Sequence, residues 1–173
     1  PIALSEQWAG MAEDIIDSGL TSSERLGIRG GSNGGLLVTA VMVQRPELYK
    51  AIISAVPLID MLRYHKLLAG ASWMAEYGNP DIAEHRAFIS EYSPYQLVSA
   101  NERYPDIFLW TNLKDDRVHP GHARKMAARM LEQGHDVIYF ESSEGGHGGG
   151  ANLNQLAVTS AMQVVYFLQQ LVD

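Results

Sequence analysis

Short continuous apolar runs alternate along the chain with longer segments of helical character. Four runs are predicted to be strands because they are apolar and bounded by polar residues or glycine: residues 25–30, 51–56, 106–112 and 136–142. Segments with helical spacing or small apolar residues separate them, at residues 6–16, 33–44, 119–133 and 153–172. This alternation predicts an α/β fold with a parallel sheet in a three-layer arrangement.

One long stretch, residues 57–105, breaks this alternation. It is rich in aromatic residues, proline and serine, and it predicts short helices that form a cap-like insertion over the sheet edge. No repeat, low-complexity tract or linker divides the sequence, so residues 1–173 are expected to form a single domain.

Charge and composition exclude several classes of function. A net charge of −7 without a basic stripe argues against a nucleic-acid partner, since such binding depends on clustered Lys and Arg. The absence of cysteine excludes disulfides, thiolate metal sites and cysteine nucleophiles. No apolar run approaches the ~18 residues of a membrane span, and the first residues lack the order of a signal peptide. We therefore expect a soluble, cytoplasmic domain without a membrane partner, unless a signal lies upstream of residue 1.

A G-x-S-x-G motif, GGSNG at residues 30–34, stands between a predicted strand and a predicted helix. In this context Ser32 is the candidate nucleophile on a sharp turn, and the flanking glycines avoid collision with the neighbouring strand and helix. The backbone N–H of Asn33 would then point at an oxyanion. The alternatives are a close-packed glycine turn or a phosphate loop, but a phosphate loop needs a lysine that residues 34–36 do not supply.

A serine nucleophile needs a base and an acid that orients the base, and α/β-hydrolases supply them in the order Ser, acid, His. Asp115 and Asp116 follow the third predicted strand, where an acid would share the rim of the sheet with Ser32. Spacing does not choose between these two, and Asp60 after the second strand is a rival. A helix N-cap or a solvated loop charge is the alternative for each.

Of the six histidines, only His147 stands in a loop between the final strand and the final helix, where a base could reach Ser32. Its setting, EGGHGGG, also resembles an HGGG oxyanion loop. That loop, however, belongs to a connection upstream of the nucleophile, and here the glycines come last. No nearby His or Cys completes a metal site, so we expect neither a metal nor another cofactor.

These motifs together resemble the C-terminal part of the catalytic domain of prolyl oligopeptidases, serine peptidases that cleave short peptides after proline. The resemblance runs through nearly the whole chain. It is carried by GGSNGGLL at 30–37, DMLRYHK at 60–66, SWMAEYGNP at 72–80, EYSPY at 91–95, DDRVHPGHA at 115–123 and GGHGGG at 145–150. It implies a triad of Ser32 as nucleophile, Asp115 as orienter and His147 as base.

The resemblance also implies a proline pocket formed by Trp73 and Tyr77, with Val118 and Asn33 beside them. A pyrrolidine ring is flat and apolar and has no N–H to satisfy, so an indole face can bury it by stacking. The alternative is that both aromatic residues belong to the core of the cap. Leu58, where the family often has valine, would narrow the pocket.

Arg117 resembles the family arginine that binds a substrate backbone carbonyl, a role that suits its fixed fork of donors. The alternative is a salt bridge to Asp116.

The sequence departs from the family mainly before Ser32. Only 31 residues precede this serine, whereas an α/β-hydrolase sheet has several strands before its nucleophile. We therefore expect a partial α/β-hydrolase domain. The resemblance implies that the second oxyanion donor, a tyrosine hydroxyl, and the β-propeller that restricts substrate size would both lie upstream. Losing one donor lowers kcat roughly 10²- to 10³-fold, so the isolated chain is expected to be weakly active or inactive. Strand 25–30 would become an exposed edge, so we also expect a homo-oligomer through this edge.

Three alternative functions are consistent with these residues and with the family resemblance. The first is a peptidase acting on short proline-containing peptides. The second keeps the same residues and changes the substrate, as in an esterase or an acylaminoacyl- or dipeptidyl-type peptidase. The third is a non-catalytic, self-associating module.

Overall fold

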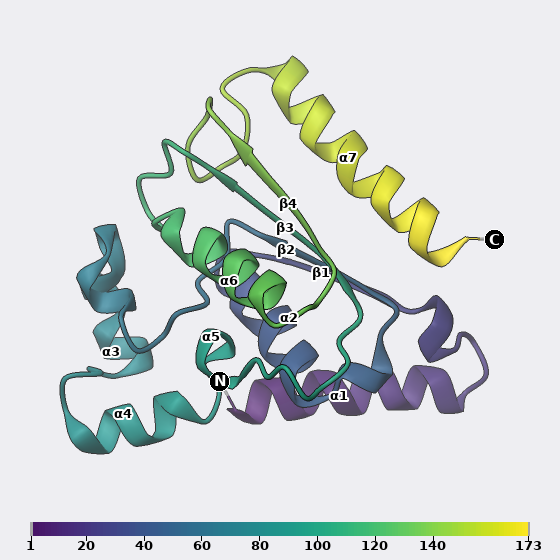
Figure 1. Cartoon of the computed structure of the whole chain (residues 1–173), viewed down its shortest axis with the longest axis horizontal. Coiled ribbons are helices and arrows are strands. Elements are labelled where there is room, and N and C mark those ends of the chain that lie inside the picture. Colours follow the sequence, from purple (N-terminus) through teal and green to yellow (C-terminus); the bar gives the residue numbers. More distant parts are fainter. Residues whose placement is uncertain (1, 173) are drawn as a thin grey trace.

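The computed structural model describes the backbone of residues 2–172 and the side chains of residues 5–172. Four strands form one sheet in the order β1-β2-β3-β4, and each neighbouring pair is parallel. Their bounds are β1 Gly27–Gly31, β2 Ala51–Ala55, β3 Asp106–Asn112 and β4 Val137–Ser142. The predicted parallel α/β fold is confirmed, and the strand before Ser32 is an edge of this sheet (Figure 1).

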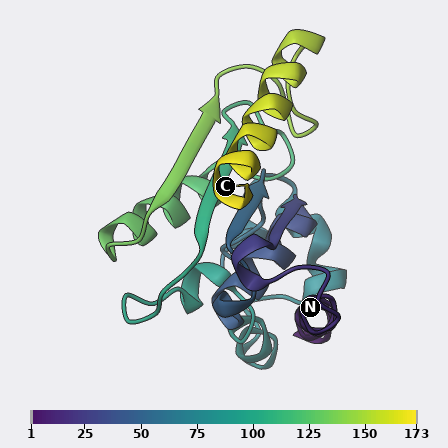
Figure 2. The ribbon, with the colours of Figure 1, turned by 90° about the vertical axis from the view of Figure 1, so that its right-hand side faces the viewer.

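Helices cover both faces of the sheet. α1 (Ile2–Asp17), α2 (Asn33–Gln44) and α6 (Gly121–Glu132) lie on one face, and α7 (Leu153–Leu171) lies on the other. The view of Figure 2 shows α7 across the strands, on the side away from α1. No helix in the described part of the chain combines the length and apolar character that crossing a bilayer requires.

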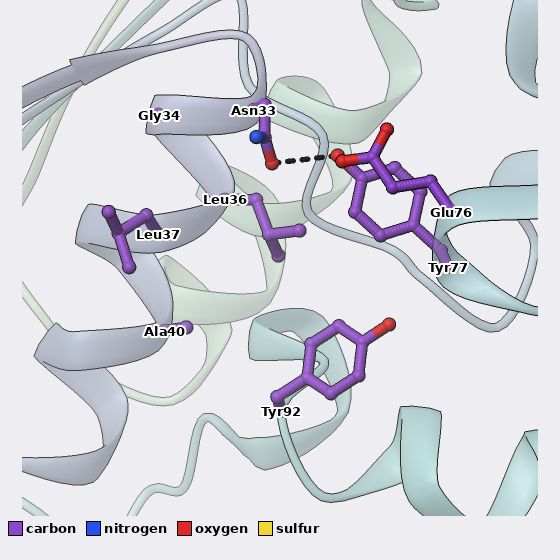
Figure 3. A pocket seen from close by; sticks show the side chains of 8 residues that line it. All are labelled: Asn33, Gly34, Leu36, Leu37, Ala40, Glu76, Tyr77 and Tyr92. Carbon is purple, nitrogen blue, oxygen red and sulfur yellow. Dashed lines mark hydrogen bonds between the residues drawn. The ribbon is translucent and has the colours of Figure 1, made fainter. Parts of the chain in front are cut away.

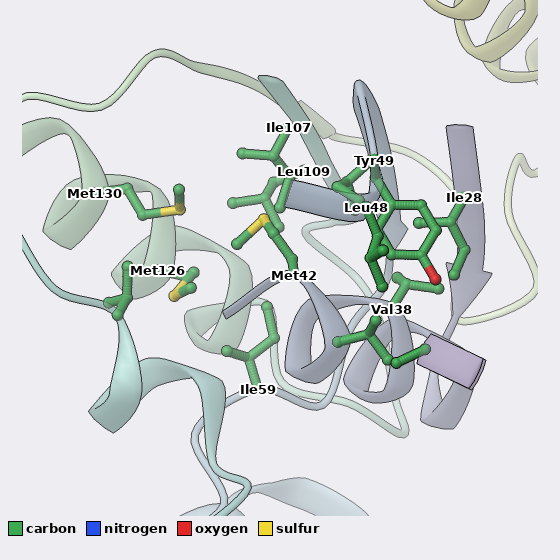
Figure 4. Packing of buried hydrophobic residues seen from close by; sticks show 14 of the residues in the cluster. Ile28, Val38, Met42, Leu48, Tyr49, Ile59, Ile107, Leu109, Met126 and Met130 are labelled. Atoms are coloured by element: carbon green, nitrogen blue, oxygen red, sulfur yellow. The ribbon is translucent and has the colours of Figure 1, made fainter. Parts of the chain in front are cut away.

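The core is split between the two faces because successive strand residues point to opposite sides. Ile52 packs into the larger cluster with α2 and α6, whereas Ile53 packs with Tyr166 of α7. Figure 4 shows the larger cluster, in which Met42 of α2 gathers with Ile107 and other strand residues. The two central strands, β2 and β3, are buried on both faces, which explains why their sequences are mostly apolar.

Residues 57–105 form short helices, as the sequence predicts, and they lie at the side of the molecule away from α7 (Figure 1). They are two 3-10 segments, Tyr64–Lys66 and Leu68–Trp73, and the helices α3 (Met74–Tyr77), α4 (Ala83–Ser90) and α5 (Pro94–Leu97). A separate buried cluster joins them to the first turn of α2 and to the loops after β2 and β3, through residues such as Tyr77, Leu36, Leu58 and Val118. The insertion therefore packs beside the carboxyl ends of the strands, where the candidate site lies.

Candidate active site

Ser32 occupies the sharp turn between β1 and α2. Its backbone has φ 58° and ψ −117°, an uncommon conformation for a residue with a side chain. Three backbone hydrogen bonds hold it: the Ser32 N–H donates to the Ala55 carbonyl (2.8 Å), and the Ser32 carbonyl accepts from the N–H groups of Leu36 (3.1 Å) and Leu58 (3.4 Å). The strained turn is thus fixed by the neighbouring strand and by the helix that it starts.

The glycines around this turn are required for space at two positions. A Cβ at Gly30 would lie 2.0 Å from the Gly34 carbonyl oxygen, so the expected clash with the helix holds there. At Gly34 the expectation was wrong, because a Cβ there would meet no atom within 4 Å. The second close approach falls on Gly35, whose Cβ would lie 2.8 Å from Pro57.

His147 lies between Ser32 and Asp115. Its Nε2 is 2.9 Å from the Ser32 hydroxyl oxygen, and its Nδ1 is 2.8 Å from Asp115 Oδ2. A carboxylate only accepts, so Nδ1 carries the proton and Nε2 is left as the acceptor for the serine hydroxyl. The three side chains thus form one continuous hydrogen-bonded chain.

Asp115 is fixed by the backbone of its own loop. Its Oδ1 accepts from the N–H groups of Arg117 and Val118, both at 2.9 Å, and its side chain is fully buried. Asp116 is exposed, and no hydrogen bond or ion pair joins it to His147 in the described part of the chain. The structure therefore brings Asp115, and not its neighbour, to the histidine.

Asp60, the other candidate acid, lies in a separate buried network. It accepts hydrogen bonds from Lys125 (2.6 Å), Arg63 (2.8 Å) and Gln96 (2.8 Å). Burial pushes the pKa of its carboxyl upward, but the hydrogen bonds and the two cations outweigh burial, so the pKa lies below its ordinary value. Asp60 is thus an ionised structural carboxylate, and among the described residues no hydrogen bond or ion pair joins it to His147.

A pocket opens directly beside Ser32. It contains all the predicted substrate-binding residues, and its full lining is Ser32, Asn33, Leu58, Trp73, Glu76, Tyr77, Arg117 and Val118. The alternative role for Arg117 is not realised, since no ion pair joins it to Asp116 among the described residues. Its guanidinium is therefore available to a ligand in the pocket.

Tyr77 and Asn33 form one wall of this pocket through a hydrogen bond from the Tyr77 hydroxyl to Asn33 Oδ1 (2.7 Å). Figure 3 shows this hydrogen bond from the side of a neighbouring pocket. Burial, with the Glu76 carboxylate beside it, raises the pKa of Tyr77, so the phenol stays neutral and keeps donating. The wall separates the Ser32 pocket from a more apolar pocket, which Leu36, Leu37, Ala40 and Tyr92 line with Asn33, Gly34, Glu76 and Tyr77. Ser32 does not line that second pocket.

Glu76 also lines the Ser32 pocket and was not predicted from the sequence. It follows Trp73 by three positions and so shares one face of a helical turn with it, which is the signal that could have identified it. The Asn33 N–H belongs to the first turn of α2, where backbone amides have no acceptor within the helix, so this N–H can donate to a bound group.

Across the described residues, no group of three or more His, Asp and Glu side chains is arranged to hold a metal ion.

Comparisons with known proteins agree with this geometry. The sequence profile of the prolyl oligopeptidase family matches residues 4–173. The chain belongs to the prolyl oligopeptidase family. It is 46% identical over 168 residues to an uncharacterized peptidase of Sinorhizobium fredii, covering 97% of this chain and 23% of that protein. It is 36% identical over 156 residues to the prolyl endopeptidase of Dictyostelium discoideum, covering 87% of this chain and 20% of that protein.

A solved member of the family shares the fold closely. The structure of a post-proline cleaving enzyme from Rickettsia typhi superimposes with a TM-score of 0.91 at 38% identity, covering 95% of this chain and 24% of that one. The chain therefore spans about a quarter of the length of its prolyl oligopeptidase relatives.

Proposed function

We propose that this chain carries the catalytic residues of a serine peptidase that cleaves peptide bonds after proline. One observation carries the proposal: the continuous chain of hydrogen bonds from Ser32 through His147 to Asp115, at 2.9 and 2.8 Å, beside an aromatic pocket. A serine hydroxyl is a weak nucleophile unless an adjacent base takes its proton, and this arrangement supplies that base.

The reaction follows from this geometry. Ser32 Oγ attacks the carbonyl carbon while His147 Nε2 takes the hydroxyl proton, which forms a C–O bond and a tetrahedral oxyanion. The Asn33 N–H donates to that oxyanion. The C–N bond then breaks as His147 gives the proton to the leaving amine, and water releases the acyl group by the same steps. Asp115 stays ionised throughout and stabilises the imidazolium.

Preference for proline is proposed from the lining of the pocket. Trp73 offers an aromatic face to a pyrrolidine ring, which brings no N–H that the apolar walls would leave unpaired. Arg117 supplies donors to a peptide carbonyl of the bound substrate. The printed names of relatives, a prolyl endopeptidase and a post-proline cleaving enzyme, agree with this preference.

We propose slow turnover for the chain by itself. Asn33 supplies one oxyanion donor, and enzymes that lose one of two donors lose roughly 10²- to 10³-fold in kcat.

The test compares two blocked peptide reporters that differ only in proline or alanine before the scissile bond. We expect cleavage of the proline reporter to be faster, to vanish in Ser32→Ala and to lose its preference in Trp73→Ala. Cleavage that persists in Ser32→Ala would refute the proposal. Cleavage that depends on Ser32 but is unchanged by the proline-to-alanine difference and by Trp73→Ala would instead favour an esterase, or a peptidase of another specificity that uses the same catalytic residues.

A further inference from the structure

We propose that Asn112 is a positioning residue that fixes the loop carrying His147. The inference rests on the proposed role of His147 as the base, and it concerns a residue that neither the motifs nor the pocket lining point to.

Asn112 is the last residue of β3 and is fully buried. Its Nδ2 donates to the carbonyl of Gly146 (2.7 Å) and to the carbonyl of Gly149 (3.3 Å), one on each side of His147. Its own carbonyl accepts from the Asp115 N–H (3.1 Å). One residue thus ties together the two loops that supply His147 and its acid.

The loop around His147 needs such an anchor because it is nearly all glycine. Glycine loses more conformational freedom on folding than any other residue, and both Gly145 (φ +88°) and Gly149 (φ +112°) adopt conformations that side chains rarely take. Within the loop, a hydrogen bond from the Gly149 N–H to the Gly146 carbonyl (3.2 Å) closes the turn. The Asn112 amide connects this turn to the end of β3.

The amide can serve in only one orientation. Turning it over would bring Oδ1 against the two carbonyl oxygens that Nδ2 now contacts, and two acceptors repel each other. In the present orientation Oδ1 is buried and finds no hydrogen-bond partner among the described residues. The two hydrogen bonds that Nδ2 donates therefore fix which way the amide faces.

Small displacements of a catalytic group have large effects, and a 1 Å misplacement can lower a rate about 10²-fold. His147 Nε2 lies 2.9 Å from the Ser32 hydroxyl oxygen, a distance that a loose loop would not hold. Loss of the Asn112 amide is therefore expected to free the loop and slow the reaction of Ser32 while the sheet remains intact.

The test uses the 173-residue chain with three variants at this position. Asn112→Asp replaces the donor with an oxygen of the same shape, Asn112→Ala removes it, and Asn112→Ser is a milder removal for use if the others fold poorly. Leu109→Ala is the matched control, because Leu109 is buried in the same strand and packs in the core away from the loop. Two readouts are compared: amide hydrogen exchange across residues 145–150, and the rate at which a fluorophosphonate labels Ser32, per folded molecule.

We expect the Asn112 variants to exchange at least about 10-fold faster in this loop and to label roughly 10- to 100-fold more slowly. Leu109→Ala should lower the unfolding temperature but leave both readouts near wild type. In Asn112→Asp, protonating the introduced carboxyl restores one donor, so loop protection relative to wild type should partly recover at low pH. A purely structural role would show no such recovery.

The two proposals fail in different ways. If the wild-type chain is not labelled at Ser32, the proposed function fails, and loop exchange still decides the role of Asn112. If wild type is labelled and the Asn112 variants match Leu109→Ala in both readouts, the positioning role is overturned.

Discussion

Asp115 sets the proton positions on His147. Its Oδ2 accepts from Nδ1 while its Oδ1 is held by two backbone N–H groups, so the carboxylate cannot turn away. Nε2 is thereby kept free of a proton and able to accept one from Ser32.

The variant Asp115→Asn tests this role. The amide oxygen can still accept from the Arg117 and Val118 N–H groups, which turns the NH₂ toward His147 and favours the wrong tautomer. We expect fluorophosphonate labelling of Ser32 to slow by about 10³- to 10⁴-fold with little change in the unfolding temperature; a loss of this order is known for the same change in a serine protease triad. Labelling within a few-fold of wild type would contradict the role.

The two glycines of the G-x-S-x-G motif offer a matched pair. A Cβ at Gly30 would overlap the Gly34 carbonyl, so Gly30→Ala should destabilise the fold by about 3 kcal/mol or more. At Gly34, within α2, the space is open and alanine is the better helix former, so Gly34→Ala should be neutral or stabilising by up to about 1 kcal/mol. Denaturant unfolding measures both, and equal losses would contradict the steric account.

Local motifs made some of these residues predictable and left others open. Ser32 could be predicted as the nucleophile from the motif GGSNG between a strand and a helix, because the turn that exposes its side chain is formed by neighbouring residues in the sequence. The choice between Asp115 and Asp116 depends on which carboxylate meets two backbone N–H groups, which only the folded loop decides. Asn112 could not be predicted, since its partners lie more than thirty residues away.

At the scale of elements, α6 holds the loop that follows β2. The buried Nδ1 of His122 accepts from the N–H groups of Asp60 (3.0 Å) and Ile59 (3.3 Å). The same loop carries Leu58 into the Ser32 pocket. Burial lowers the pKa of His122 from 6.5 to about 4, because a charged imidazole there would lose its hydration.

This lowered pKa predicts how stability depends on pH. As the pH falls below 6.5, the unfolded chain takes up a proton at His122 before the folded one does, so stability declines until about pH 4. The slope is about 1.4 kcal/mol per pH unit, and the total loss is up to roughly 3 kcal/mol. In His122→Asn, whose amide oxygen can accept the same N–H groups without titrating, the decline should lack this contribution. Unfolding curves of identical pH slope in both proteins would contradict the assignment.

Element boundaries were predictable where the signal is local. The predicted bounds of one helix, 33–44, and of one strand, 106–112, are the observed bounds of α2 and β3. α6 begins at Gly121 rather than His119, because the His119 ring accepts from the Gly121 N–H in a turn before the helix. The short helices of 57–105 were predicted only as a group, without individual bounds. Their positions depend on packing against residues such as Leu36 and Val118 and not on a periodic pattern in their own sequences.

At the scale of the whole molecule, two exposed features lie together. β1 is an edge strand, and α7 contacts it, since Arg29 donates to Gln163. The outer side of α7 exposes an apolar stripe that includes Val164 and Leu168, each more than half exposed. An unpaired strand edge beside apolar surface favours association between copies.

We therefore predict that the chain self-associates at micromolar concentration. Light scattering should give a mass above the 19.1 kDa of one chain, and Leu168→Glu should shift it toward the monomer because a charge cannot be buried there unpaired. Asp17→Asn, an exposed change on α1, is the control and should leave the mass unchanged. A monomeric wild type would rule the prediction out.

The proposed function depends above all on Ser32 being a nucleophile that His147 activates. The most direct measurement is mass-spectrometric mapping of the fluorophosphonate adduct on the wild-type chain and on His147→Gln. We expect a single adduct on Ser32, formed at least about 10³-fold more slowly when the imidazole is replaced. An adduct elsewhere, or equal labelling of Ser32 in both proteins, would contradict it.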